Sequence, residues 1–163
     1  MTQMAEHSQP TSTWTQRLLA AEQQWLLQNA SAQERLVWVQ GAGLLPADAE
    51  SNGLRLSVNA DGECLMGDVV MRSAEWPVLS DSLDGVILHH VIETGADLFE
   101  WMPEVVRVLK PEASVWIFTT GLATQARHRL LQPDTSMRSW LRPMRSGRLA
   151  AMLQALGCVE VAH

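Results

Sequence analysis

Hydrophobic positions follow two different periods along the chain, and the two periods alternate. Apolar residues at a spacing of three to four predict helices at 14–28, 98–109, 121–131 and 147–156, with shorter helical stretches at 69–75 and 90–94. Short apolar or alternating runs predict strands at 35–40, 54–58, 63–66, 85–88, 114–119 and 158–162. Strands that alternate with helices indicate an α/β protein with a mostly parallel sheet, doubly wound in the Rossmann-like manner, and helices on both faces.

Several element ends carry their own chemical markers. Thr13 is a candidate N-cap for the first helix, because its hydroxyl can accept from an unpaired backbone N–H. Pro111 ends the helix at 98–109, because the residue before a proline disfavours the helical conformation. Gly157 stands where a left-handed residue would end the helix at 147–156.

A parallel sheet also predicts where a ligand would bind. Such sheets bind ligands beyond the carboxyl ends of their strands, where the strand order reverses. The candidate positions are therefore those that follow Gln40, Val58, Met66 and Leu88.

Composition narrows the class of protein. The 163 residues predict one domain at 14–163 behind a flexible leader at 1–13. The formal net charge of −6 argues against a protein that binds nucleic acid by neutralising phosphates. The polar first residues resemble no signal peptide, and no apolar run is long enough to span a membrane, so we expect a cytoplasmic protein. The two cysteines, Cys64 and Cys158, form no zinc-binding motif.

A set of short motifs follows in a fixed order between residues 67 and 118. The motifs are Gly67-Asp68, Trp76-Pro77, Asp81-Ser-Leu-Asp84, the strand at 86–88, His90-Val-Ile-Glu93 and Arg107-Val-Leu-Lys-Pro111. In order and spacing they resemble the second half of class I methyltransferases that depend on S-adenosylmethionine (SAM), and most closely the small bacterial enzymes that act on small molecules.

The resemblance implies roles for particular residues. A carboxylate at the position of Asp68 would accept a hydrogen bond from the adenine amino group; the alternative is an ordinary turn after Gly67. Leu88, His89 and His90 would border the methyl donor, and either histidine could take a proton from the methyl acceptor. Alternatively, one histidine is solvated and the other packs against or caps the following helix.

His89, His90 and Glu93 are residue types that can bind a metal. Adjacent histidines project in different directions and a third ligand is not evident, so we expect no metal.

The first half of the chain departs from the same family. The family's strand-one acid is Val39 here, and its Gly-x-Gly-x-Gly loop is reduced to Gly41 and Gly43. The acid that would bind the ribose hydroxyls is replaced by Asn59, which has a single carbonyl acceptor. Only residues 44–53 separate the loop from the second strand, although a parallel crossover normally needs a dozen or more. The predicted cofactor-binding set is Gly41, Gly43, Asn59, Asp68 and Leu88.

The family's closing antiparallel hairpin is also shortened, since only its first strand, 158–162, is present. The strand at 114–119 would then be an open edge, and open edges pair with other chains unless they are blocked. We therefore expect a homo-oligomer or a protein partner at this edge.

Three functions stay open at the level of the sequence. One is a SAM-dependent methyltransferase with an unknown, small-molecule acceptor. The second is a catalytically degenerate methyltransferase-like protein that acts as a binding or regulatory partner. A small nucleotide-binding module ranks last, because no phosphate-binding GxxxxGK[ST] motif occurs.

Overall fold

The computed structural model describes residues 13–30, 35–41, 53–59, 62–92, 97–119 and 146–159. The predictions for Gly43, Glu93, the helix at 121–131 and the crossover at 44–52 lie outside these residues. The chain divides into two compact units, Met1–Ser31 and Ala32–His163. No helix of the described residues is long and apolar enough to cross a membrane.

The first unit contains the helix α1 (Thr13–Asn29), which the spacing of apolar residues predicted at 14–28. Thr13 is already helical, so its predicted role as the N-cap is wrong by about one residue, the usual error at a helix end. At the other end the Asn29 side chain donates to the Trp25 carbonyl at 2.7 Å, and the Ala30 N–H donates to the Leu26 carbonyl at 2.7 Å. These bonds satisfy carbonyls that the end of a helix leaves open.

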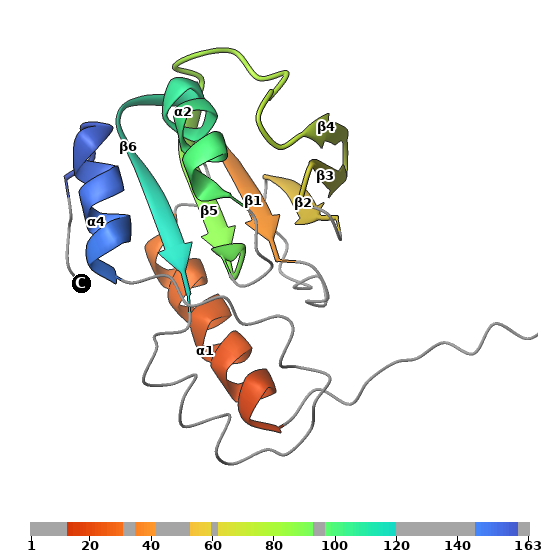
Figure 1. Ribbon diagram of the computed structural model, residues 1–163. Helices are drawn as coiled ribbons and strands as arrows, with labels where there is room; N and C mark the ends of the chain where they lie inside the picture. The colour runs from red at the N-terminus through yellow and green to blue at the C-terminus, as the bar shows by residue number, and fades with distance from the viewer. Residues whose placement is uncertain are drawn as a thin grey trace, which may run out of the picture. The chain divides into compact units, whose positions relative to one another are not determined.

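The second unit is built on a six-stranded sheet with the order β4-β3-β2-β1-β5-β6 (Figure 1). The four strands β2, β1, β5 and β6 run parallel to one another. This confirms the predicted α/β class and the mostly parallel sheet. The strands are β1 (Leu36–Gln40), β2 (Leu54–Val58), β3 (Cys64–Gly67), β4 (Val70–Arg72), β5 (Leu83–His89) and β6 (Leu109–Phe118).

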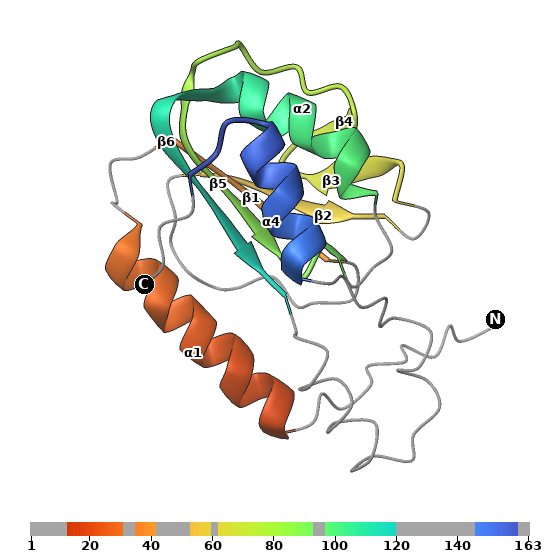
Figure 2. The same cartoon turned by 60° about the vertical axis from the view of Figure 1, so that its left-hand side comes forward.

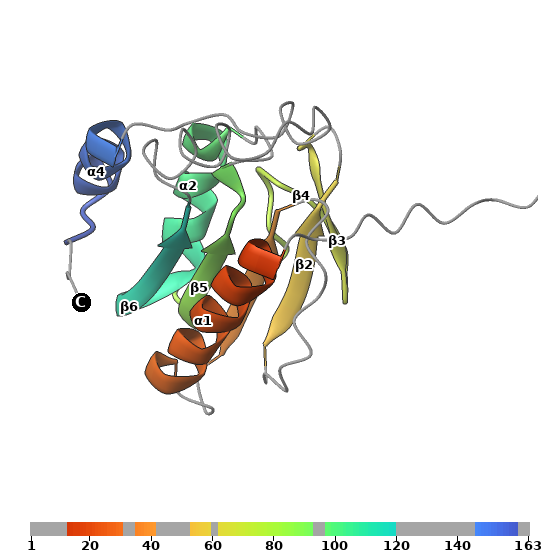
Figure 3. The ribbon, with the colours of Figure 1, turned by 90° about the horizontal axis from the view of Figure 1, so that it is seen from below.

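Two helices of this unit, α2 (Leu98–Val108) and α4 (Ser146–Ala155), cover one face of the sheet (Figure 2). The side chain of Asp97 caps α2 by accepting from the Phe99 N–H at 2.9 Å. Gly157 follows α4 with φ +82°, the left-handed conformation predicted from its position. Seen from below, α4 lies beside β6, at the opposite end of the sheet from β3 and β4 (Figure 3).

One hydrophobic core joins this face of the sheet to both helices. Alternate residues of β1 and β5 point into it, and α2 contributes the largest buried side chain, Trp101. Met152 of α4 belongs to the same cluster. The fully buried members at the centre are Val37, Val39, Val86, Leu88, Met102 and Val105. Central strands with buried residues on both faces read as continuous apolar runs, which is why β1 and β5 were found from the sequence.

The far end of the sheet corrects two predictions. The stretch at 69–75 was expected to be helical, but Val70–Arg72 form the strand β4, paired antiparallel with β3. The residues after Met66 were expected at the ligand-binding edge with the ends of the parallel strands, yet β3 runs antiparallel to β2, so its end lies near the amino end of β2. The cause is the length of the connection, because the few residues between Val58 and Cys64 can make a hairpin but no parallel crossover. Gly62, at φ +80°, makes the turn.

The other edge also differs from the prediction. The strand β6 begins at Leu109 and not at Ser114, because Leu109 pairs with Leu83 across a register shift that precedes the regular pairing of Ser114 with Gly85. Glu112 lies within the shifted part at φ +65°. Of the strand predicted at 158–162, Cys158 and Val159 are not in a strand, and residues 160–162 lie outside the described part of the chain.

Candidate functional site

The strand order reverses between β1 and β5, because the chain continues from β1 to β2 on one side and later returns to β5 on the other. Gln40 lies opposite His89, and the Gly41 N–H donates to the His89 carbonyl at 2.8 Å. The His90 N–H in turn donates to the Phe118 carbonyl at 2.9 Å. The carboxyl ends of β1, β5 and β6 are therefore joined by backbone hydrogen bonds at the position where α/β sheets bind ligands.

His90 has an unusual backbone conformation at this position. Its φ of +54° is left-handed, a conformation that costs a residue with a Cβ about 1–3 kcal/mol and persists where the surrounding structure holds it. Its side chain is 8% exposed, and its ring lies 4.8 Å from the ring of His89. Such strain concentrates at ligand-binding and catalytic positions, so His90 is the strongest individual candidate at this edge.

His89 is surrounded by aromatic rings. Its ring centroid lies 5.8 Å from Trp38 and 5.5 Å from Phe118, both in edge-on arrangements, and the residue is 4% exposed. Strand alternation turns its side chain away from the α2 face, because its neighbour Leu88 points into the core there. The two adjacent histidines therefore combine one ring packed among aromatics with one ring placed by a strained backbone.

Asn59 also lies at the carboxyl end of its strand, β2, as the sequence predicted. Its side-chain oxygen accepts from the Cys64 N–H at 3.0 Å, and its own N–H donates to the Cys64 carbonyl at 3.0 Å. Asn59 therefore closes the hairpin between β2 and β3, which uses one of the two lone pairs of its side-chain oxygen.

Two other predicted residues are placed differently. The side chain of Leu88 is fully buried in the core, so only its backbone borders the strand ends. Asp68 lies beside Arg55, near the amino end of β2, because β3 runs antiparallel. A carboxylate oxygen of Asp68 accepts from the Arg55 N–H at 2.8 Å, and the Asp68 N–H donates to the Arg55 carbonyl at 3.1 Å. The structure therefore brings together Gly41, Asn59, His89 and His90, and it does not bring Asp68 to them.

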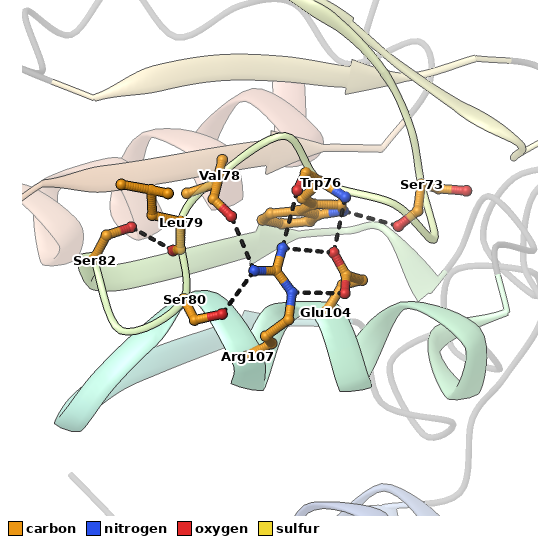
Figure 4. A network of polar contacts seen from close by, with 8 residues as sticks. All are labelled: Ser73, Trp76, Val78, Leu79, Ser80, Ser82, Glu104 and Arg107. Atoms are coloured by element: carbon orange, nitrogen blue, oxygen red, sulfur yellow. Dashed lines mark hydrogen bonds and ion pairs between the residues drawn. The ribbon is translucent and has the colours of Figure 1, made fainter.

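The arginine of the Arg107-Val-Leu-Lys-Pro111 motif has a structural task. Its guanidinium donates to both carboxylate oxygens of Glu104 at 2.8 and 2.9 Å (Figure 4). It also donates to the Trp76 carbonyl, the Val78 carbonyl and the Ser80 hydroxyl, at 2.9, 3.0 and 3.0 Å. Arg107 therefore fastens the segment between β4 and β5 to α2, with a planar fork of donors that suits several acceptors at once.

Glu104 completes this network from the helix side. Its Oε2 accepts from the Trp76 N–H at 2.8 Å, and the Trp76 indole donates to the Ser73 carbonyl at 2.8 Å. The hydrogen bond from Arg107 holds the pKa of Glu104 below its ordinary value, and Glu104 holds the pKa of Arg107 above its ordinary value. A shallow hollow of about 330 Å³ is lined by Glu75, Trp76, Pro77 and Glu104. None of these residues lies at the carboxyl ends of the parallel strands. The pairing of Glu104 with Arg107 was not predicted from the sequence, although Glu104 stands three residues before Arg107 on a predicted helix.

Asp84, the last residue of the Asp81-Ser-Leu-Asp84 motif, is likewise structural. Its carboxylate accepts from the Arg35 N–H at 2.9 Å and pairs with the Lys110 ammonium. The Arg35 hydrogen bond, then the Lys110 side chain, lower the pKa of Asp84 from its ordinary value. Asp84 therefore links the chain at the starts of β1, β5 and β6, at the amino ends of these strands.

The arrangement of the sheet and its helices defines a class I SAM-dependent methyltransferase-like fold, and comparisons with solved structures agree. A SAM-dependent methyltransferase from Archaeoglobus fulgidus matches with a TM-score of 0.62 and 19% identity, over 86% of this chain and 68% of that one. A SAM-dependent methyltransferase from Thermotoga maritima, described as a possible histamine N-methyltransferase, matches with a TM-score of 0.51 and 13% identity, over 86% of this chain and 78% of that one. No family model and no curated protein sequence matches this chain.

The residues at the strand ends fit SAM only in part. Gly41 has no Cβ to obstruct a nucleoside cofactor, although the residue is buried and its N–H is bonded to the His89 carbonyl. Val39, at the position where the resemblance calls for an acid, is fully buried in the core. The described residues at the carboxyl ends of the parallel strands, 40–41, 58–59, 89–92 and 118–119, include no carboxylate. Hydroxyl groups of a bound ribose would therefore meet amide and imidazole groups at these positions, which are weaker acceptors than a carboxylate.

Proposed function

We propose that this protein binds SAM at the carboxyl ends of β1, β2 and β5 and transfers its methyl group to a small-molecule acceptor. The observation that carries the proposal is the position of His89 and His90, at the reversal of strand order in a methyltransferase-like fold. The chain's resemblance to small bacterial methyltransferases, and the similar fold of a possible histamine N-methyltransferase, support a small acceptor.

In this proposal SAM supplies an electrophilic methyl group on a sulfonium, and the chain positions the acceptor and excludes water. The Gly41 backbone borders the cofactor, while Asn59 reaches the ribose side with the amide nitrogen of its side chain. His90 holds or removes the proton of the acceptor amine or hydroxyl, because a neutral imidazole has a nitrogen that can accept a proton. Alignment of donor and acceptor supplies most of the acceleration, so the base has a secondary effect on the rate.

A second function, a methyltransferase-like binding protein without activity, is favoured by one specific observation. Three residues that the resemblance assigns to SAM binding are altered or engaged elsewhere. Val39 stands in place of an acid, the side-chain oxygen of Asn59 accepts from the Cys64 N–H, and Asp68 binds the backbone of Arg55. A partner protein would then make use of the fold while the cofactor edge is unused.

Calorimetry with SAM and with its demethylated product, S-adenosylhomocysteine, separates the two functions. We expect binding of SAM in the micromolar to submillimolar range, weakened in His90→Asn and in Asn59→Ala. Asparagine tolerates the left-handed backbone of His90 while it removes the imidazole, so the fold is kept. Asp68→Ala is the matched control, and its affinity for SAM should equal that of the unaltered protein. No heat with either ligand at millimolar concentration contradicts the enzyme and supports the binding protein.

A further inference from the structure

The two edges of the sheet are built differently. The edge at β4 is a strand of three residues that ends in Arg72, and short charged edges resist pairing with other chains. The edge at β6 carries the run Ser114-Val-Trp-Ile-Phe118, which contains no charge, no proline and no glycine. Apart from exposed Ser114, its residues are half-buried, whereas their neighbours in β5 are buried. The usual devices that block strand pairing are confined to the first half of β6, at Lys110, Pro111, Glu112 and the register shift, and the half from Ser114 to Phe118 has none of them.

The direction of the backbone groups of β6 follows from its pairing with β5. The Phe118 carbonyl accepts from His90 and therefore points toward β5. Backbone groups alternate in direction along a strand, so those of Trp116 also face β5, and those of Val115 and Ile117 face outward. Within the described residues, no strand pairs with this outer side of β6.

The spacing of the outward groups is complementary to itself. When an identical strand runs antiparallel, with Trp116 on the two-fold axis, Val115 comes opposite the partner subunit's Ile117 and Ile117 opposite the partner subunit's Val115. Each of these two pairs exchanges both N–H···O bonds, as in a hydrogen-bonded antiparallel pair. Ser114 then comes opposite the partner subunit's Phe118, and no like charges meet.

The indole of Trp116 packs against Gly85 of the neighbouring strand in its own sheet. A Cβ added at Gly85 would lie 2.5 Å from the Trp116 ring and 2.7 Å from the Leu36 side chain. Trp116 therefore covers the space that Gly85 leaves open, and its backbone can meet a second copy without a clash between the two indoles at the axis.

We propose that β6 pairs with β6 of a second copy of this chain, antiparallel about a two-fold axis at Trp116, to form a continuous twelve-stranded sheet. Closed two-fold symmetry gives a dimer and no further growth, because the other edge of each sheet is the short strand β4. The dimer requires neither SAM nor an acceptor, so it is independent of the proposed function.

A proline substitution tests the outward groups directly. Ile117→Pro removes an N–H that faces away from β5, so the bonds between β5 and β6 are kept, and proline is tolerated on edge strands. Ile117→Ala is the matched control, because it loses comparable packing but keeps the N–H. Two-fold symmetry means that the proline removes two intermolecular bonds, and we expect the dimer dissociation constant to rise at least about tenfold. Analytical ultracentrifugation should show a dimer for the unaltered protein and Ile117→Ala, and a weakened one for Ile117→Pro.

Hydrogen exchange of the unaltered full chain supplies a second measurement that needs no variant. The Val115 and Ile117 amides should be protected only at concentrations where the dimer forms, while the Trp116 amide should be protected at every concentration by β5. A monomer at all concentrations overturns the proposal. So does a dimer that Ile117→Pro leaves intact, or protection of Val115 and Ile117 that does not change with concentration, since a segment of the same chain would then occupy the edge.

Discussion

The two ends of the sheet differ in strand direction, and the length of the connections between the strands explains the difference. At one end, β1, β5 and β6 are parallel, buried against α2, and tied together by Asp84 and by the backbone bonds of His89 and His90. At the other end, β3 and β4 form an antiparallel hairpin with exposed side chains such as Val70, at 69%. The parallel end has the length of chain that a helical crossover needs, and the hairpin end has only a turn.

This difference explains where the residues named from the methyltransferase resemblance lie. The histidines and Gly41 lie at the parallel end, where the strand ends gather at one edge. Asp68 belongs to the hairpin end, where the reversal of β3 carries it toward the start of β2. A motif that matches a family in chain order therefore need not place its residue at the same position in space.

The largest difference between the two ends should appear in stability. Trp101→Ala removes a side chain that is 1% exposed in the core, and we expect the free energy of unfolding to fall by about 3–5 kcal/mol. Val70→Ala at the hairpin should change it by no more than about 0.5 kcal/mol, because this side chain is mostly exposed. Urea denaturation of both variants measures this. Equal losses would show that the hairpin shares the core's packing.

Substitutions at two glycines test how closely the backbone is packed. A Cβ at Gly67 would lie 2.1 Å from the Arg55 carbonyl oxygen, so Gly67→Ala must separate β3 from β2 and should cost about 1–3 kcal/mol. Gly147→Ala in α4 meets nothing within 4 Å and should stabilise the protein by about 0.5–1 kcal/mol, because alanine favours the helix. Thermal unfolding of the pair gives the sign of each effect, and a tolerated Gly67→Ala would contradict the close approach of β3 and β2.

The smallest effect should come from the polar network at α2. The pKa of Glu104 is lowered by Arg107, so its stabilising effect is complete above the ordinary carboxyl pKa and is lost as the pH falls through the lower, folded-state pKa. Below a pH of about 5 the melting temperature should therefore fall more steeply with decreasing pH in the unaltered protein than in Glu104→Gln. Glu100→Gln, in the first turn of the same helix, is the control and should keep the slope of the unaltered protein. Identical slopes for all three proteins would remove Glu104 as the source.

Local patterns were enough to find most of the elements. The strand β2 was predicted with its observed bounds, because Leu54, Leu56 and Val58 alternate with polar residues. The helices α1, α2 and α4 were found within one or two residues from the spacing of apolar positions. The strand β4 was mistaken for a helical turn, because three residues are too few to establish a period.

The candidate site was only partly accessible from the sequence. Gly41, Asn59 and the two histidines were named because they follow predicted strands. The left-handed backbone of His90 and the engagement of Asn59 by Cys64 leave no trace in the order of residues. The same holds for Arg107, whose acceptors at Trp76, Val78 and Ser80 come from a segment far away along the chain.

Local periodicity is sufficient to predict the helices, the strands and the class of fold, because side-chain burial repeats with the geometry of each element. The tertiary structure alone decided that Asp68 binds the backbone of Arg55, away from the edge where the histidines lie, and which backbone groups of β6 face outward. Those outcomes depend on which strands become neighbours and in which direction. The packing of the whole sheet determines which strands are neighbours, and a short stretch of sequence does not carry that information.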